Sequence, residues 1–141
     1  MAAHDVDLVF GNMTELELRQ WVNANPGRVN DRDLRKKTPL FRAIDLNSVP
    51  LILWSVKEKG ADLNAVDRHK HTVLYVVGSL EVFNALLECG ADPGLPDASN
   101  YTLLIMQFYY SRWDIVTQLL QDPRVHTTID VQDRHQGYTV L

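Results

Sequence analysis

The residues that could support nucleophilic chemistry are few, and a single cysteine is the first of them. Cys89 is the only thiol in the 141-residue chain. No histidine stands at a fixed spacing from it that would indicate an activating base, and no Gly-x-Ser-x-Gly elbow occurs. Cys89 directly precedes Gly90, where a helix is expected to end, and free cysteines commonly pack as small apolar side chains. We therefore interpret Cys89 as structural.

Histidines are the second candidates, as metal ligands. His69 and His71 flank Lys70, and His135 lies in a similar context further along the chain. A metal site needs ligands that converge on one point, whereas these histidines are expected on separate surface loops beside a lysine whose charge disfavours a cation. Glycines stand singly, so there is no phosphate-binding glycine loop. The sequence predicts no enzyme activity, no metal and no cofactor.

Composition excludes further classes. With 18 acidic and 14 basic residues the net charge is −4, which disfavours a general nucleic-acid binder. The apolar runs are too short to span a membrane, and the N-terminus does not resemble a secretory signal. One cysteine fits a reducing compartment. We expect a cytoplasmic protein, with the nucleus as an open alternative.

The elements that would position these residues recur along the chain. Similar Thr-x-Leu segments begin at 38, 72, 102 and 139, and each follows an aspartate by five or six residues. Gly60-Ala61-Asp62 recurs as Gly90-Ala91-Asp92, and Asn64 has a counterpart 34 residues upstream in Asn30. Such agreement predicts internal repeats. The opening aspartates are Asp33, Asp67, Asp97 and Asp133.

Each unit is expected to contain two short helices. Thr38 can cap the first helix, with Pro39 at its first position, and this helix should end near Asn47. Ser48 can cap the second, and Gly60 can end it in a left-handed conformation.

Capping patterns indicate further helices on both sides. Thr14 with Glu17 forms a capping box, and that helix should end at 25–27. A short helix over 6–10 is expected before it. Ser111 with Asp114 predicts a helix start in the third unit.

These motifs resemble the ankyrin-repeat family, whose pattern is Thr-Pro-Leu-His-x-Ala followed by Leu-Leu and Gly-Ala-Asp. The resemblance rests on Thr38-Pro39-Leu40-Phe41-Arg42-Ala43 and on the two Gly-Ala-Asp turns. It implies an all-α solenoid of paired antiparallel helices with β-turn or hairpin fingers, in which each aspartate caps its turn through backbone N–H groups. The array would comprise an irregular unit 1–32, units 33–66, 67–96 and 97–132, and a truncated start at 133–141.

Departures from the family pattern lie in the turns and in the second unit. The family glycine at the turn tip is replaced by Lys36, Lys70 and Asn100. Either these turns adopt another conformation, or they are strained, since lysine tolerates positive φ at a cost. The second unit is short, which predicts a clipped first helix.

Two groups of side chains are candidate partner contacts. Basic residues recur at the finger tips, either as a solvated edge or as a rim that steers an acidic peptide. Phe108, Tyr109, Tyr110 and Trp113 exceed what one repeat core can hold, so one or two should be exposed, Tyr109 or Tyr110 most of all. They would otherwise pack on the next repeat. The proposed contacts are Arg35, Lys37, Arg42, Arg68, His69, His71, Tyr101, Tyr109, Tyr110 and Arg112.

The resemblance implies a protein–protein interaction module that binds a protein or peptide partner. The alternative is a targeting or adaptor domain of a larger enzyme or ubiquitin-ligase-type assembly that continues beyond this sequence. The chain stops within a motif, at Thr139-Val140-Leu141. We therefore expect further repeats or a partner to cover its C-terminal end.

Overall fold

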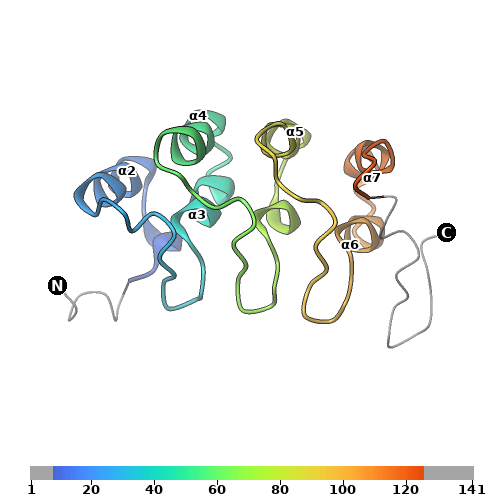
Figure 1. Cartoon of the computed structure of the whole chain (residues 1–141), viewed down its shortest axis with the longest axis horizontal. Helices are drawn as coiled ribbons and strands as arrows, with labels where there is room; N and C mark the ends of the chain where they lie inside the picture. Colours follow the sequence, from blue (N-terminus) through green and yellow to red (C-terminus); the bar gives the residue numbers. More distant parts are fainter. Residues whose placement is uncertain (1–7, 126–141) are drawn as a thin grey trace.

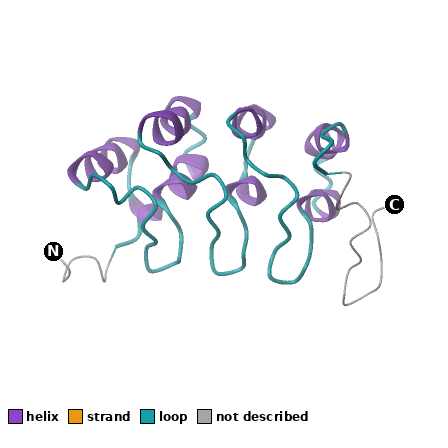
Figure 2. Cartoon of the chain, in the orientation of Figure 1, coloured by secondary structure: helices purple, strands orange, loops and turns teal. Residues whose placement is uncertain are grey.

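Short helices and long loops alternate along the chain. A computed structural model describes residues 8–125, and in this part the protein is all-α, with six α-helices and no β-strand (Figure 2). There are three further helical turns in this part: η1 precedes α2, and η2 and η3 lie between α4 and α5. The α-helices are α2 (Glu15–Ala24), α3 (Pro39–Asp45), α4 (Val49–Leu53), α5 (Leu80–Glu88), α6 (Leu103–Tyr109) and α7 (Trp113–Leu120). The turns are η1 (Phe10–Asn12), η2 (Trp54–Glu58), a π-helical continuation of α4, and η3 (Val73–Val76).

The elements lie in two rows (Figure 1). In one row η1 contacts α3, α3 contacts η3, and η3 contacts α6. In the other, α4 contacts α5 and α5 contacts α7, while α2 contacts α3 across the rows. Three long loops project on the side away from α4, α5 and α7 (Figure 1). Helices from distant parts of the sequence therefore hold the loops side by side.

Helix starts follow the sequence signals in part. The capping box of Thr14 and Glu17 is confirmed, because each side chain accepts from the backbone N–H of the other. Pro39 occupies the first turn of α3 after Thr38, as expected. The Thr38 hydroxyl, however, makes no capping hydrogen bond and is buried without a partner. Its predicted role as a side-chain cap is therefore wrong.

Two other local predictions also need correction. Ser111 does not cap α7: it has a left-handed φ of 54°, and Arg112 is the residue that precedes the helix. The Asp114 carboxylate accepts from the neighbouring N–H of Ile115, so no capping box forms. The short helix expected over 6–10 is also misplaced within the described residues, because η1 begins at Phe10 and Val9 is extended.

The segment 67–96 has the clipped first helix that its short length predicts. Only η3, a single 3₁₀ turn, stands where α3 and α6 stand elsewhere. Ser79 then starts α5, and its hydroxyl accepts from the N–H of Val82 at 3.2 Å. The short length of this segment therefore affects its first helix, while α5 extends over nine residues.

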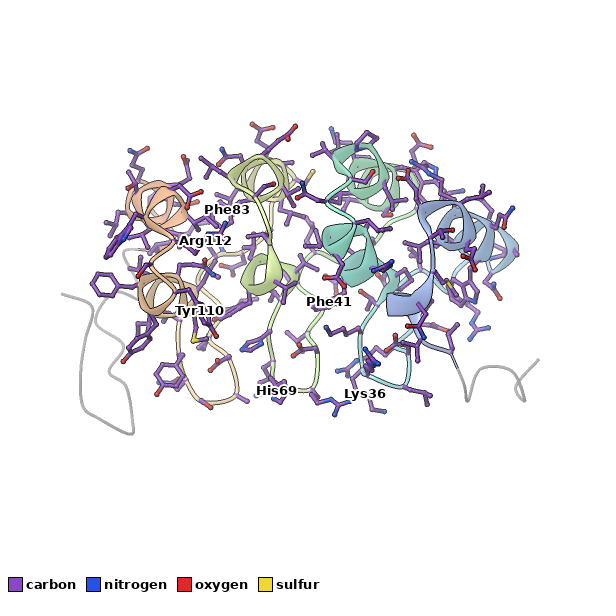
Figure 3. All side chains as sticks on the ribbon, turned by 180° about the vertical axis from the view of Figure 1, so that it is seen from behind. Lys36, Phe41, His69, Phe83, Tyr110 and Arg112 are labelled. Carbon is purple, nitrogen blue, oxygen red and sulfur yellow. The ribbon has the colours of Figure 1, made fainter. Side chains whose placement is uncertain are left out.

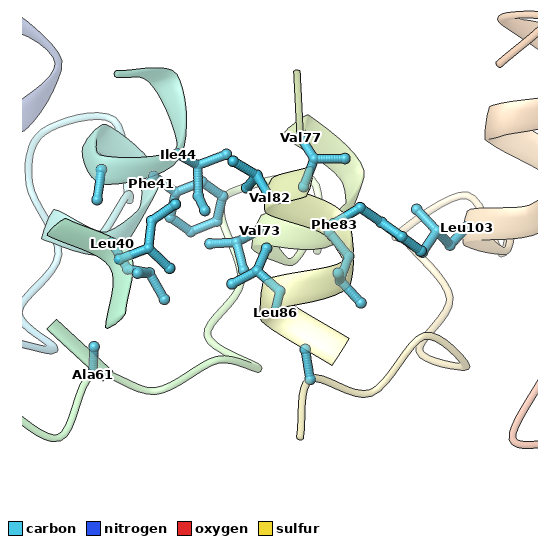
Figure 4. Packing of buried hydrophobic residues seen from close by; sticks show 14 of the residues in the cluster. Leu40, Phe41, Ile44, Ala61, Val73, Val77, Val82, Phe83, Leu86 and Leu103 are labelled. Carbon is cyan, nitrogen blue, oxygen red and sulfur yellow. The ribbon is translucent and has the colours of Figure 1, made fainter. Parts of the chain in front are cut away.

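One continuous apolar core joins both rows (Figure 4). Phe41 on α3 and Phe83 on α5 are fully buried, and Leu103 on α6 extends the core toward the other end. Burial of large apolar side chains of this kind is worth about 1.5–3 kcal/mol each, so packing between neighbours holds helices that are too short to be stable alone. Figure 4 shows further core members, among them Leu40, Ile44, Ala61, Val73, Val77, Val82 and Leu86.

Several predictions fall outside the described residues, namely those on Val6, Asp133, His135 and the truncated unit 133–141. Within residues 8–125 no helix has the length and apolarity that crossing a bilayer would require.

Candidate functional site

Three finger loops carry most of the predicted contact residues: loop 1 (32–37), loop 2 (66–71) and loop 3 (96–101). In each, one aspartate oxygen, Oδ1, accepts two backbone N–H groups of its own loop. This confirms the turn-capping role expected from the family resemblance. The bonds join Asp33 to Arg35 and Lys37 at 2.8 and 3.1 Å, Asp67 to His69 and His71 at 2.8 and 3.1 Å, and Asp97 to Ser99 and Tyr101 at 2.9 Å each.

The loop tips adopt the left-handed conformation without glycine. The φ angles are 61° at Lys36, 59° at Lys70 and 67° at Asn100. Of the two alternatives left by the sequence, a different turn conformation is therefore wrong. In this conformation the Cβ of any L-residue lies close to a carbonyl oxygen; asparagine tolerates this because its short polar side chain can hydrogen-bond locally, whereas lysine has no such compensation and is strained.

Hydrogen bonds also join each loop to the next. Arg32 bridges loops 1 and 2, donating to the carbonyl oxygens of Lys36 at 3.1 Å and Val66 at 2.8 Å. The N–H of Ala98 in loop 3 donates to the carbonyl of His69 in loop 2 at 2.9 Å. Sequence reasoning missed Arg32, because its acceptors are backbone groups that only the packed loops bring within reach.

His71 belongs to these connections and is not the freely exposed residue that we expected. Its Nε2 lies 3.1 Å from Oδ2 of Asp97, its Nδ1 lies 4.0 Å from Asp67, and its ring stacks on Tyr75 at 4.8 Å. The Tyr75 hydroxyl lies 2.7 and 3.0 Å from the carbonyl oxygens of Leu95 and Tyr101, which share its single proton as acceptors. Burial, and then the Asp97 carboxylate, raise the pKa of Tyr75. These contacts favour a structural role for His71 between loops 2 and 3.

Four of the predicted contacts meet in one place. Arg35, Lys37, Arg68 and His69, together with Asp67, line an open cavity of about 310 Å³ between loops 1 and 2, here called the arginine cavity. Figure 3 shows Lys36 and His69 at the ends of these two neighbouring loops. The basic finger-tip row of the sequence is thus gathered into a local concentration of positive charge.

Two other predicted contacts are engaged within the protein. Arg42 is half-buried and donates from Nε to the carbonyl of Met13 at 2.7 Å. Arg112 donates to the carbonyl of Val77 at 3.5 Å and lies 3.8 Å from Asp114. Both guanidinium groups therefore connect helices to distant backbone, and neither is the open surface group that the sequence suggested.

An aromatic patch occupies the other end of the described chain. Its members are Phe108, Tyr109, Tyr110 and Trp113, with exposed fractions of 45, 58, 66 and 54%. Phe108 and Trp113 meet edge to face at 5.1 Å, and Tyr109 approaches Tyr101 at 6.3 Å. Tyr110 is the most exposed, as predicted, and it lies at the end of α6 (Figure 3). The expectation that only one or two are exposed is wrong, because aliphatic side chains already fill the inward face of α6.

The residues considered for catalysis lie apart. Cys89 is half-buried at the end of α5. Among residues 8–125, no three His, Cys, Asp or Glu side chains are placed to share a metal ion.

No protein-family model matches the chain, and no curated protein is significantly similar to it in sequence.

Proposed function

We propose that the protein is an ankyrin-type array that recognises a partner protein through its finger loops and the aromatic patch. The proposal takes the units to begin at Asp33, Asp67 and Asp97. Rigid loops and short stacked helices would hold the contact side chains in place, so little conformational entropy is lost on binding.

Equivalent hydrogen bonds at equivalent positions support the ankyrin-type arrangement. Oδ1 of Asn30 accepts from the N–H of Asp62 at 2.7 Å, and Oδ1 of Asn64 accepts from the N–H of Asp92 at 3.1 Å. An asparagine thus connects one proposed unit to the turn of the next at two equivalent positions, Asn30 and Asn64, which lie 34 residues apart in the sequence. Together with the aspartate-capped loops, this favours a common structural unit over coincidence.

The exposed aromatic patch is the single observation that carries the recognition role. Tyrosine and tryptophan are enriched among the residues that dominate binding energy, because they bury large area with few rotatable bonds. Of seven large apolar or aromatic side chains exposed in the described residues, five lie between 108 and 120. Such a concentration of exposed apolar surface is typical of an interface.

The test compares partner capture by the native chain and a Tyr109→Ala/Tyr110→Ala variant. Each protein is immobilised, incubated with cell extract, and the captured proteins are quantified by mass spectrometry. Loss of a central aromatic contact costs about 2 kcal/mol or more, so captured partners should fall at least tenfold.

Leu16→Ala is the matched control, because Leu16 on α2 is 65% exposed and lies outside the patch. It should capture the same partners as the native chain. Circular dichroism establishes that both variants are folded. Equal capture by the double variant and the native chain would contradict the proposal.

A further inference from the structure

The arginines of the described chain divide into six that contact other protein groups and two that do not. The two are Arg35 and Arg68, whose guanidinium groups make no hydrogen bond or ion pair within residues 8–125. The other six pair with a carboxylate or a backbone carbonyl: Arg19 with Glu15, Arg28 with Asp31, Arg32 with Val66, Arg42 with Met13, Arg112 with Val77, and Arg124 with Asp122.

Both uncommitted arginines line the arginine cavity. Arg35 comes from loop 1 and Arg68 from loop 2, with Lys37 and His69 beside them. The one acidic group there is Asp67, which is 6% exposed and whose Oδ1 already accepts two backbone N–H groups. Counting His69 as neutral, three positive charges face one negative charge, a surplus of two.

We propose that the arginine cavity binds a phosphorylated side chain of the partner protein. A phosphomonoester carries close to two negative charges at neutral pH, which matches the local surplus, whereas one carboxylate leaves it half balanced. Arginine presents paired N–H groups that suit phosphate oxygens. This inference rests on the proposed role in partner recognition, but it concerns a different surface from the aromatic patch.

The size and charge of the surroundings favour a single modified side chain. The cavity, about 310 Å³ and open to solvent, has room for one phosphorylated side-chain group. The whole chain carries a net charge of −4. A long acidic segment would extend beyond the cavity and be repelled by the net negative charge of the protein. A compact dianion inside the cavity would interact mainly with the local positive charge.

Hydrogen bonds hold the backbones of loops 1 and 2 in place relative to each other before any ligand binds. Arg32 joins loop 1 to the Val66 carbonyl of loop 2, and Asp67 closes loop 2 on itself. The backbones that carry Arg35 and Arg68 are thus connected by hydrogen bonds, and binding needs to order only their side chains.

The test is a nuclear magnetic resonance titration with short Gly/Ser peptides. One peptide carries a central phosphotyrosine, one a phosphoserine and one a glutamate at the same position. We expect at least one phosphopeptide to shift the amide signals of residues 34–37 and 67–70 saturably. The glutamate peptide should bind about tenfold more weakly or not at all, since it provides half the charge.

Matched variants assign the effect to the cavity. Replacing Arg35 and Arg68 with glutamine should weaken phosphopeptide binding by about tenfold for each arginine. Arg19→Gln/Arg28→Gln is the control, because it removes the same charge from arginines that pair elsewhere, and it should bind as the native chain does. Both variants are checked for native amide spectra outside the substituted sites.

Three results would overturn the inference. They are equal binding of the glutamate peptide, unchanged binding by the Arg35→Gln/Arg68→Gln variant, and tighter binding of random duplex DNA than of either phosphopeptide at equal phosphate concentration. None of them affects the aromatic-patch test, in which Arg35 and Arg68 are native. Failure of the phosphate site is therefore distinguishable from failure of partner recognition.

Discussion

Replacing the left-handed lysines with glycine should stabilise the protein. Lys36 and Lys70 have φ angles of 61° and 59° and exposed side chains. A left-handed L-residue costs about 1–2 kcal/mol. Glycine removes this cost but adds about 0.5–1 kcal/mol through the greater freedom of the unfolded chain. Each Lys→Gly change should therefore raise the free energy of unfolding by about 0.5–1 kcal/mol.

The assay is urea unfolding followed by far-UV circular dichroism, with thermal unfolding alongside it. The Lys36→Gly/Lys70→Gly variant should gain about 1–2 kcal/mol, since the two sites lie in separate loops and their effects should be nearly additive. Its melting temperature should rise by about 3 °C for each kcal/mol. The slope of unfolding free energy against urea should stay unchanged.

Two controls separate backbone strain from other causes. Lys36→Gln removes the positive charge but keeps a Cβ, so it should give little of the gain. Asn100→Gly changes a residue that tolerates its φ of 67°, so it should be neutral or slightly destabilising. The strain argument fails if Lys36→Gln reproduces the stabilisation, or if Lys36→Gly and Lys70→Gly both destabilise.

Three further predictions concern buried groups and one turn. Thr38→Val and Thr72→Val should each raise the free energy of unfolding by about 1 kcal/mol, because their buried hydroxyls have no hydrogen-bond partner. Thr102→Val should lower it by about 1 kcal/mol, because the Thr102 hydroxyl accepts from a helix N–H. Urea unfolding measures all three variants, and destabilisation by the first two would contradict the reasoning. Because the pKa of Tyr75 is raised in the folded protein, the tyrosine of the unfolded chain ionises first as pH rises. The free energy of unfolding should therefore fall above pH 10.0, the ordinary tyrosine pKa, by up to about 1.4 kcal/mol per pH unit. Unfolding at alkaline pH tests this, and an identical pH dependence in Tyr75→Phe would oppose it. Gly90→Ala should cost about 1 kcal/mol from backbone strain alone, because φ is 98° and an added Cβ meets nothing within 4 Å; a loss above about 3 kcal/mol in thermal unfolding would disagree.

Local signals in the sequence predicted local structure well. The Thr14–Glu17 capping box, the proline start of α3 and the clipped η3 all depend on residues within one turn or on the length of a segment. The failure at Ser111 is instructive, because serine followed by Asp114 has the same spacing as a real cap. There the backbone of Ser111 adopts a left-handed conformation before α7, and the pattern of side chains does not predict this conformation.

The residue types at the candidate site could be predicted from the sequence, but which of its arginines are not already engaged by other protein groups could not. The sequence placed basic residues at the finger tips, and Arg35 and Arg68 do share a cavity. It could not separate them from Arg42 or Arg112, because the carbonyl groups that engage those two belong to distant segments. Arg19 and Arg28 pair with carboxylates three or four residues away, which spacing along the chain can indicate, whereas the partners of Arg42 and Arg112 depend on packing between distant segments.

The bonds between the finger loops also determine how slowly their amide hydrogens exchange with solvent. The N–H of Asp67 donates to the carbonyl of His71, and the N–H of Ala98 donates across to His69. Neither residue belongs to a helix or strand, yet each amide opens only when its loop detaches from its own turn or from its neighbour. Slow exchange should therefore extend from the helices into the loops, and the row of fingers should open as a coupled unit.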